Sequence, residues 1–322
     1  MSLYIVSGLI YCVELIILEE KQMKRFPITS CVIFKAELPS AEALEEHLKE
    51  LPFVDILESH SISYGFIPNK ITGELVTPIE GGYIITFRID EKILPKAAIA
   101  FEVNRRIEKL KEQGIDDFLE AELKHIAIEE MLKVALTKTK IITALYHVKK
   151  GFLFVSTTRK PDHQALLGSL VKACGTVKTE TFHIDDAKNG ITTRLSNHID
   201  NEPPAECFGH DLYPGNFLLL QRKLDKKLET LKYDAELNLI REQVKDSIDS
   251  HFKVCLIELS TFDISFKLTD DFDFKNIKPL IEIDCDGDKV FRYRHTNAVF
   301  MFHMVNTIEL LIELLKYKEK TE

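Results

Sequence analysis

Several features that mark membrane proteins and many enzymes are missing from this sequence. Tryptophan is absent, and no apolar run reaches the ~20 residues that a membrane-spanning helix needs. The most apolar stretch, Leu3–Leu18, is short, contains Glu14 and has no basic segment before it, so it is also a poor secretion signal. We therefore expect no membrane partner. We interpret residues 1–22 as an N-terminal extension from a start assigned too far upstream, or as an extra strand or helix packed on the body.

The residues that hold metals and cofactors show no recognisable spacing. The six cysteines are scattered without a Cys-x-x-Cys pair, which favours reduced thiols in a cytoplasmic protein over a disulfide framework. The 11 histidines show no metal-ligand pattern. A phosphate loop of the Gly-x-x-x-x-Gly-Lys-Ser/Thr type and a Gly-x-Ser-x-Gly nucleophile turn are both missing. The sequence thus predicts no metal and no cofactor.

The clustered carboxylates that a nuclease uses to hold Mg²⁺ are also sparse. The densest run, 284–289 (DCDGDK), fails the EF-hand spacing because glycine stands fourth and no Glu closes the loop. We expect it to be a turn between strands at 281–283 and 290–293. Glu80, Asp90 and Lys92 resemble a nuclease arrangement only faintly. We predict no catalytic residue, and a metal-dependent DNA exonuclease stays open as the alternative function.

One long segment, in contrast, is rich in positive charge. Residues 131–160 contain no Asp or Glu. The longer segment from Met131 to Thr179 contains nine basic residues and only one acidic residue, Asp162. The whole chain has a net charge of −9. A basic segment on an acidic body is typical of a site for a polyanion. Two other interpretations remain open, a solvated face that has few acids and a contact surface for an acidic protein.

The pattern of strands and helices predicts an α+β fold with mostly antiparallel sheets. In region 23–184 we expect strands at 28–36, 61–68 and 83–89 and a helix at 41–51 capped by Ser40. Helices at 96–113 and 116–136 form a helical hairpin that projects between strands. A basic β-hairpin at 138–160 follows, with strands at 140–147 and 152–157, then a helix from Pro161 to Cys174 and a strand at 176–184.

The second part of the chain begins after a loop-rich boundary at 185–215, which contains Pro203-Pro204 and Pro214-Gly215. In the C-terminal α+β region, 216–322, we expect strands at 216–222, 253–259 and 261–268. A charged helix fills most of 234–250, and a long terminal helix covers 297–317. Hydrophobic residues make up 45% of the chain, which is enough for a substantial core.

The order of several short motifs resembles the bacterial recombination-associated RdgC family. The most specific is Glu91–Pro95 (EKILP), which closes a strand before a basic helix. Gly65–Pro68 (GFIP) resembles a turn of the family, and the hairpin at Gly151 and the helix ending at Gly175 follow in the expected order. Residues 217–225 and 254–267 match later strands more loosely, so the resemblance covers the chain from Phe26 to its C-terminus.

The resemblance implies a function as well as a fold. It implies a ring-forming subunit, so that a homodimeric ring holds double-stranded DNA in a positively lined central hole without sequence preference. It also implies RecA as a partner in recombination and a place in the cytoplasm with the nucleoid. The name exonuclease is sometimes attached to the family.

This chain departs from the family pattern after the second helix of the hairpin. The stretch 132–136 (LKVAL), followed by Lys138, lacks the family's proline and carries Leu136 in place of an aromatic residue. The family's tryptophan in the following strand is missing too. Any subunit contact that this aromatic residue makes in the family is therefore not carried over to this chain.

We predict that eight basic residues face the DNA. Two of them stand two positions apart on a strand, so they share one face, and two more lie in the turn of the same hairpin. The others come from the first helix of the helical hairpin and from the end of a later strand. The predicted DNA-binding residues are Lys138, Lys140, Lys149, Lys150, Arg105, Arg106, Arg222 and Lys223.

Overall fold

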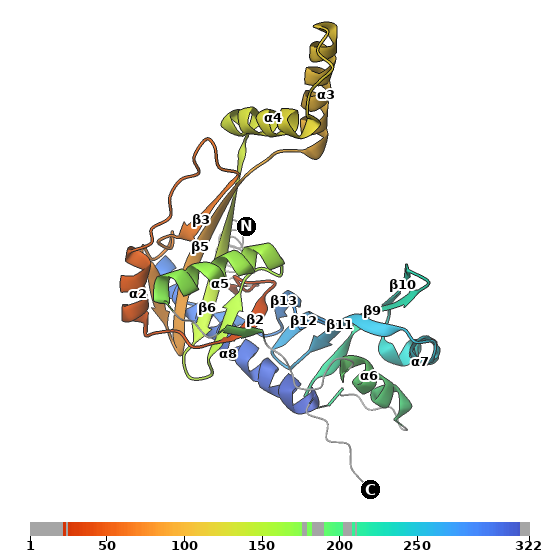
Figure 1. The fold of residues 1–322 in the computed structure, drawn as a ribbon. Helices are drawn as coiled ribbons and strands as arrows, with labels where there is room; N and C mark the ends of the chain where they lie inside the picture. Colours follow the sequence, from red (N-terminus) through yellow and green to blue (C-terminus); the bar gives the residue numbers. More distant parts are fainter. Residues whose placement is uncertain are drawn as a thin grey trace, which may run out of the picture.

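The computed structural model describes residues 22–23, 25–175, 179–181, 190–201, 208–209 and 211–315. These residues form an α+β protein in which all named strands pair antiparallel, so the predicted fold class is confirmed. In Figure 1 the chain follows a crescent that runs from the α3–α4 hairpin at one end to the β9–β10 hairpin at the other. The predicted extension 1–22, except Gln22, lies outside the described residues, as does Lys178 of the basic segment.

The first sheet has seven strands in the order β3-β5-β6-β7-β2-β8, with β4 paired to β5. Two helices, α2 (Ala41–Lys49) and α5 (Lys160–Cys174), contribute to the core on one face, where Leu44 and Leu166 pack with Phe87. Ser40 caps α2 as predicted, because its Oγ accepts a hydrogen bond from the backbone N–H of Ala43. The strands are β2 (Val32–Ala36), β3 (Ile62–Phe66), β4 (Val76–Ile79), β5 (Gly82–Lys92), β6 (Thr137–His147), β7 (Phe152–Val155) and β8 (Thr179–Thr181).

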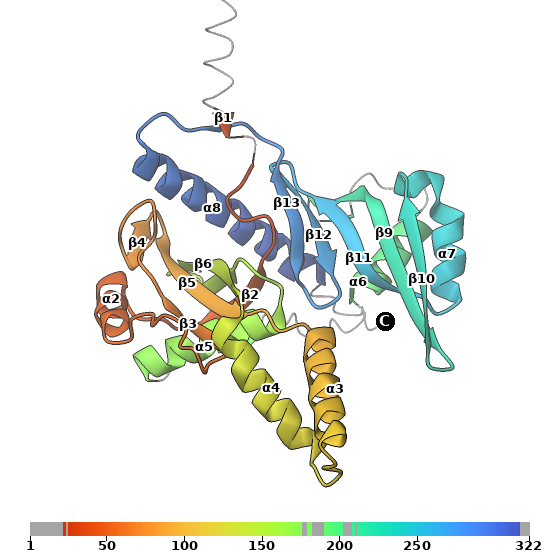
Figure 2. The same ribbon diagram turned by 90° about the horizontal axis from the view of Figure 1, so that it is seen from above.

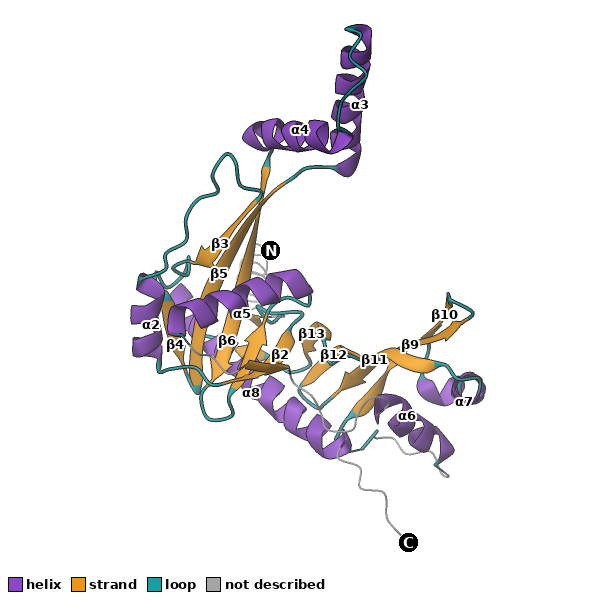
Figure 3. Cartoon of the chain, in the orientation of Figure 1, coloured by secondary structure: helices purple, strands orange, loops and turns teal. Residues whose placement is uncertain are grey.

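The helical hairpin projects from one end of this sheet, as Figures 1 and 3 show. It consists of α3 (Lys96–Glu112) and α4 (Glu120–Val134), close to the predicted 96–136. Both flanking strands, β5 and β6, are 11 residues long and pair along their whole length. The backbone N–H of Ile93 donates to the carbonyl of Leu136 and closes the neck of the hairpin. The hairpin is thus carried on a long two-stranded ribbon.

The second sheet has five strands in the order β10-β9-β11-β12-β13. Helices α6 (Gly190–Asp200), α7 (Arg241–Asp249) and α8 (Lys289–Leu315) contribute buried residues to the core on one face of it. Seen from above in Figure 2, the opposite face carries no helix of the described chain. The strands are β9 (Tyr213–Leu224), β10 (Lys227–Asp234), β11 (Lys253–Ser260), β12 (Ile264–Thr269) and β13 (Phe274–Pro279), and β1 (Gln22–Met23) pairs with β14 (Ile283–Asp284).

A shared core joins the two sheets into one body. Phe300 of α8 packs edge-on against Phe26 and Phe154, and α8 also contacts the core side of the second sheet. Just before β2, Cys31 exchanges two backbone hydrogen bonds of 2.9 Å with Phe274 of β13. Among the described residues α8 is long and apolar enough to span a membrane, but 56% of its most apolar window is buried inside the protein. We therefore assign it as a core helix.

Several predicted elements differ from the structure. Helix α8 begins at Lys289, so the strand predicted at 290–293 is wrong; Asp288 starts the helix by accepting a 2.7 Å hydrogen bond from the N–H of Phe291. Residues 285–288 do form the predicted connection before it. The charged helix expected in 234–250 begins only at Arg241, and strands β10 and β13 were missed. The stretch 185–215 contains α6 and is not made of loops alone.

Candidate nucleic-acid interface

The structure places Lys138 and Lys140 at the start of β6, two positions apart and on one face, as predicted. Lys140 is largely used within the fold, because its Nζ lies 3.2 Å from Glu91 Oε2 and 3.3 Å from Asp162 Oδ1. Lys138 is exposed, and no carboxylate of the described residues lies within ion-pair distance of it. Lys138 is therefore free to meet an external anion, whereas Lys140 has internal partners.

Lys149 and Lys150 occupy the turn between β6 and β7, at the opposite end of the sheet. A strand rises about 3.4 Å per residue, so the length of β6 separates them from Lys138 by roughly 30 Å. Lys150 forms an ion pair with Glu309 of α8, and Lys149 is exposed. The four lysines of the predicted basic hairpin thus belong to two separate places.

The arginines of the predicted set are also engaged within the protein. Arg105 on α3 forms a 2.8 Å ion pair with Glu102. Arg106 contacts the same Glu102 at 2.9 Å and Glu130 of α4 at 2.6 Å, so it fastens the two helices of the hairpin together. Both guanidinium groups are therefore already paired with carboxylates of the helical hairpin, and a DNA phosphate would have to compete with these carboxylates.

Arg222 and Lys223 are neighbours on β9 and therefore point to opposite faces of the second sheet. Arg222 lies on the core side, where its Nε is 2.6 Å from Glu229 and its guanidinium stacks 4.5 Å from the ring centroid of Phe252. Lys223 is exposed on the other side and pairs in register with Leu228. We call this second side the open face of the five-stranded sheet.

Lys223 shares the open face with five further lysines. Along each strand the apolar residues that alternate with them, such as Leu218, Leu220 and Phe266, are buried in the core. The register of neighbouring strands then aligns the intervening positions on the other side. Two acids, Asp234 and Glu258, lie on the same side. The lysines of the open face are Lys223, Lys232, Lys253, Lys267, Lys275 and Lys278.

Few of these charges are balanced by the fold. Lys232 forms a 3.4 Å ion pair with Asp234, and the other five lysines have no carboxylate of the described residues within ion-pair distance. Lys275 is nevertheless close enough to Asp270 and Asp273 to counter part of the rise in pKa that burial causes in both carboxyls. Lys267 and Lys275 are direct register partners on β12 and β13. Like charges placed opposite each other destabilise a sheet, so this face carries a cost that a bound anion would relieve.

Sequence reasoning found only Lys223 of this set, because the other five lysines form no run of positive charge along the sequence. The signal in the sequence that could have identified these lysines is the alternation of apolar and polar residues along each strand. Residues 264–269 (ISFKLT) bury every second side chain and leave the lysine outside. Combined with the register of the sheet, such isolated lysines become a patch that is visible only in three dimensions.

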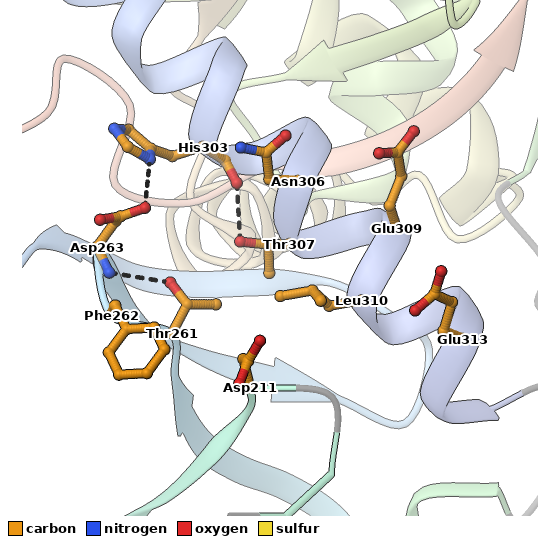
Figure 4. A pocket seen from close by; sticks show the side chains of 10 residues that line it. All are labelled: Asp211, Thr261, Phe262, Asp263, His303, Asn306, Thr307, Glu309, Leu310 and Glu313. Atoms are coloured by element: carbon orange, nitrogen blue, oxygen red, sulfur yellow. Dashed lines mark hydrogen bonds and ion pairs between the residues drawn. The ribbon is translucent and has the colours of Figure 1, made fainter.

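A cavity beside α8 is lined by acidic side chains. Figure 4 shows this cavity of about 360 Å³, where Asp263 lies 3.1 Å from Nδ1 of His303. Its carboxylates would repel phosphate, so this cavity is a poor place for a nucleic acid. The carboxylates that line it are Asp211, Asp263, Glu309 and Glu313.

The faint nuclease arrangement of Glu80, Asp90 and Lys92 is not assembled. Glu80 precedes β5, whereas Asp90 lies near the end of that 11-residue strand. Burial alone would raise the pKa of Asp90, but hydrogen bonds from Arg88 and Thr139 outweigh it and hold the pKa below its ordinary value. The carboxylate of Asp90 is therefore a structural acceptor.

Lys92 has a structural role as well. Its ammonium group donates to the backbone carbonyls of Leu57 and Glu58, at 2.9 and 2.6 Å, and so fastens the loop before β3 to the end of β5. Among the described residues, no group of three or more His, Cys, Asp or Glu side chains is placed to hold a metal ion. What the open face presents to a ligand is a set of lysine side chains, and lysine pairs with anions such as phosphate.

Comparison with known proteins agrees with the order of motifs in the sequence. The family described as "Putative exonuclease, RdgC" matches residues 28–317. Recombination-associated protein RdgC of Neisseria meningitidis serogroup C is 22% identical over 310 residues, which cover 92% of this chain and 97% of that protein. The protein of the same name from Neisseria gonorrhoeae shows the same identity and coverage. With the match extending over nearly all of both folded regions, the chain belongs to the RdgC family.

Proposed function

We propose that this protein binds double-stranded DNA without sequence preference and acts in recombination as one half of a ring-shaped homodimer. The observation that carries the proposal is the open face, where six lysines and two acids lie on a chain whose net charge is −9. Lysine contacts to phosphate oxygens supply affinity and carry no sequence information. A flat sheet face of lysines fits the DNA backbone and has no helix that would enter a groove.

The crescent shape supports the ring. Its two ends expose apolar side chains that a monomer would leave in water, with Phe101 72% and Val134 84% exposed at the helical hairpin and Leu228 64% exposed at the β9–β10 hairpin. In a two-fold dimer each end would meet the same end of the partner. Such a closed ring would enclose the open face and keep the acidic cavity of α8 outside.

The names of the relatives place them in recombination, and we propose the same process for this chain. A ring on duplex DNA would compete with other proteins for the backbone, and RecA is the partner that the family resemblance predicts. A nucleoid location in the cytoplasm follows from DNA binding. The family description also contains the word exonuclease, so the test below includes Mg²⁺.

The test is a gel-shift titration of labelled linear duplexes of two unrelated sequences, with and without Mg²⁺. We expect equal affinities for both sequences, a shift without shortening of the label, and a log K that falls by ~0.9 per phosphate contact with log salt. Mg²⁺-dependent loss of label would favour the exonuclease. If no duplex is shifted at low salt, the remaining interpretation is that the lysines form a contact surface for an acidic protein.

A matched pair of variants tests the interface itself. Lys253→Ala with Lys278→Ala removes two charges from the open face, and Lys70→Ala with Lys289→Ala removes two exposed charges elsewhere. The first pair should lower the number of phosphate contacts, read from the slope of log K against log salt, by about two per subunit, and the second pair should not. Equal weakening by both pairs would mean that global charge, and not the open face, governs binding.

A further inference from the structure

An aromatic side chain lies among the lysines of the open face. Phe217 of β9 is half-buried, and the Nζ atom of Lys267 lies 3.5 Å from its ring centroid. Nζ of Lys232, on the neighbouring strand β10, lies 5.4 Å from the same centroid. Two ammonium groups from two different strands thus share one ring.

The position of Lys267 is informative because a carboxylate stands beside it. Glu258 is its direct register partner on β11, yet the two side chains form no ion pair. The Lys267 side chain instead reaches across β11 to the ring of Phe217 on β9. An ion pair with Glu258 would have neutralised the ammonium, whereas the face of an aromatic ring orders it and leaves its full charge available.

The position of Lys267 over the Phe217 ring helps to distinguish binding of a single strand by base stacking from binding of a duplex through its phosphates. Sheets that bind single strands present open aromatic faces on which bases stack. The face of Phe217 is covered by Lys267, so the ring is not free to receive a base. The arrangement fits contact with the phosphate backbone of a duplex.

We propose, on the basis of the proposed function, that Phe217 is a positioning residue that holds the ammonium group of Lys267 ready for the phosphates of double-stranded DNA. Lys232 lies farther from the same ring and is also paired with Asp234. Ordering a lysine before binding removes part of the side-chain entropy that each contact otherwise costs. The ring contributes to affinity although it touches no DNA atom and carries no charge.

The experiment compares Phe217→Leu, Phe217→Tyr and the control Phe302→Leu, an exposed phenylalanine on α8. Each protein is titrated with a labelled duplex and with a single strand of the same length. We expect Phe217→Leu to weaken duplex binding about five-fold, and Phe217→Tyr and Phe302→Leu to bind like the wild type. A wild-type protein that binds no duplex would refute the proposed function itself.

Two results would overturn the positioning role while the proposed function stands. One is unchanged duplex affinity in Phe217→Leu, and the other is a larger loss for the single strand than for the duplex, which would indicate base stacking. A double-mutant cycle separates positioning from folding: in a Lys232→Gln, Lys267→Gln background, Phe217→Leu should have no further effect. NMR of the lysine side chains adds a direct readout, since ring-current shifts of the Lys267 methylenes should disappear in Phe217→Leu.

Discussion

At the scale of single residues, the partner of a lysine decides what the lysine can do. Lys140 lies between two carboxylates and stabilises the fold, whereas Lys267 lies on an aromatic ring and keeps its charge for a ligand. Both are half-buried lysines on central strands, and sequence alone does not distinguish them. Charge counts along a chain therefore overestimate the part of the charge that reaches solvent.

Lys140→Ala should destabilise the protein more than it weakens DNA binding. Asp162 is 8% exposed, and the change removes a positive partner from this buried carboxylate. The carboxylate keeps only the 3.7 Å contact with Arg159, so the loss of its closer, half-buried partner should cost about 1–3 kcal/mol. Urea unfolding would show this loss, and Lys138→Ala, an exposed neighbour on the same face, should change stability by less than about 0.5 kcal/mol. Equal losses in the two variants would contradict the assignment.

Mild acid should destabilise the fold through buried histidines. Burial, with Lys160 nearby, lowers the pKa of His163, and burial also lowers the pKa values of His147 and His198. Below pH ~6.5 the unfolded chain takes up these protons and the folded chain does not, so stability present above that pH is lost as the pH falls.

Thermal unfolding between pH 7.5 and 5.5 measures this loss, and His163→Leu should flatten the profile. Nδ1 of His163 is buried without a hydrogen-bond partner among the described residues, so the apolar variant leaves no acceptor unsatisfied. At lower pH the raised pKa values of Asp270 and Asp273, both caused first by burial, act in the opposite direction. A steeper profile in His163→Leu would refute the argument.

At the scale of elements, the long β5–β6 ribbon depends on close backbone contact at Gly82. A Cβ atom built on Gly82 would lie 1.8 Å from the carbonyl oxygen of Tyr146 on β6. Gly82→Ala should therefore force the strands apart and cost several kcal/mol, on the order of 3. Gly168 in α5 is the control: a Cβ there meets nothing within 4 Å, so Gly168→Ala should stabilise the helix by about 0.5–1 kcal/mol. Urea unfolding of both variants should give opposite signs.

The sequence predicted the elements whose signals are local. Ser40 caps α2, and the β-hairpin at Gly151 forms, both as predicted. Sequence reasoning missed β10, Lys227–Asp234, which is a charged segment without clear alternation for which no element was predicted. Pairing with β9 makes this segment a strand. Such pairing depends on a neighbouring strand, so the propensities of the residues in the segment do not predict it.

The candidate site shows the same division. Lys138, Lys149 and Lys223 are exposed without acidic partners among the described residues, while the other five of the predicted eight are paired with carboxylates of the fold. Four of these five have a partner on another element, and Arg105 is paired within α3. The lysines of β11, β12 and β13 become one surface only through the register of the sheet. Register depends on long-range pairing, so a linear search for charge could not find them.

At the scale of the whole molecule, a ring and an open clamp make different predictions about DNA topology. Both would use the open face, and both would bind linear and circular duplexes at low salt. With six phosphate contacts, a rise from 50 to 200 mM salt lowers affinity about a thousand-fold. A clamp then leaves either substrate, whereas a closed ring leaves a linear duplex over its ends and stays on a closed circle.

We therefore expect that protein loaded at low salt resists a high-salt wash on covalently closed circular DNA and is lost from the same DNA after linearisation. Light scattering should give a particle of twice the 37.0 kDa chain mass in the absence of DNA. The Lys253→Ala, Lys278→Ala variant separates loading from retention, because it should load poorly while any loaded ring should still resist the wash on circles. Equal loss from circular and linear DNA, with a dimer present, would show that the subunits bind DNA without enclosing it.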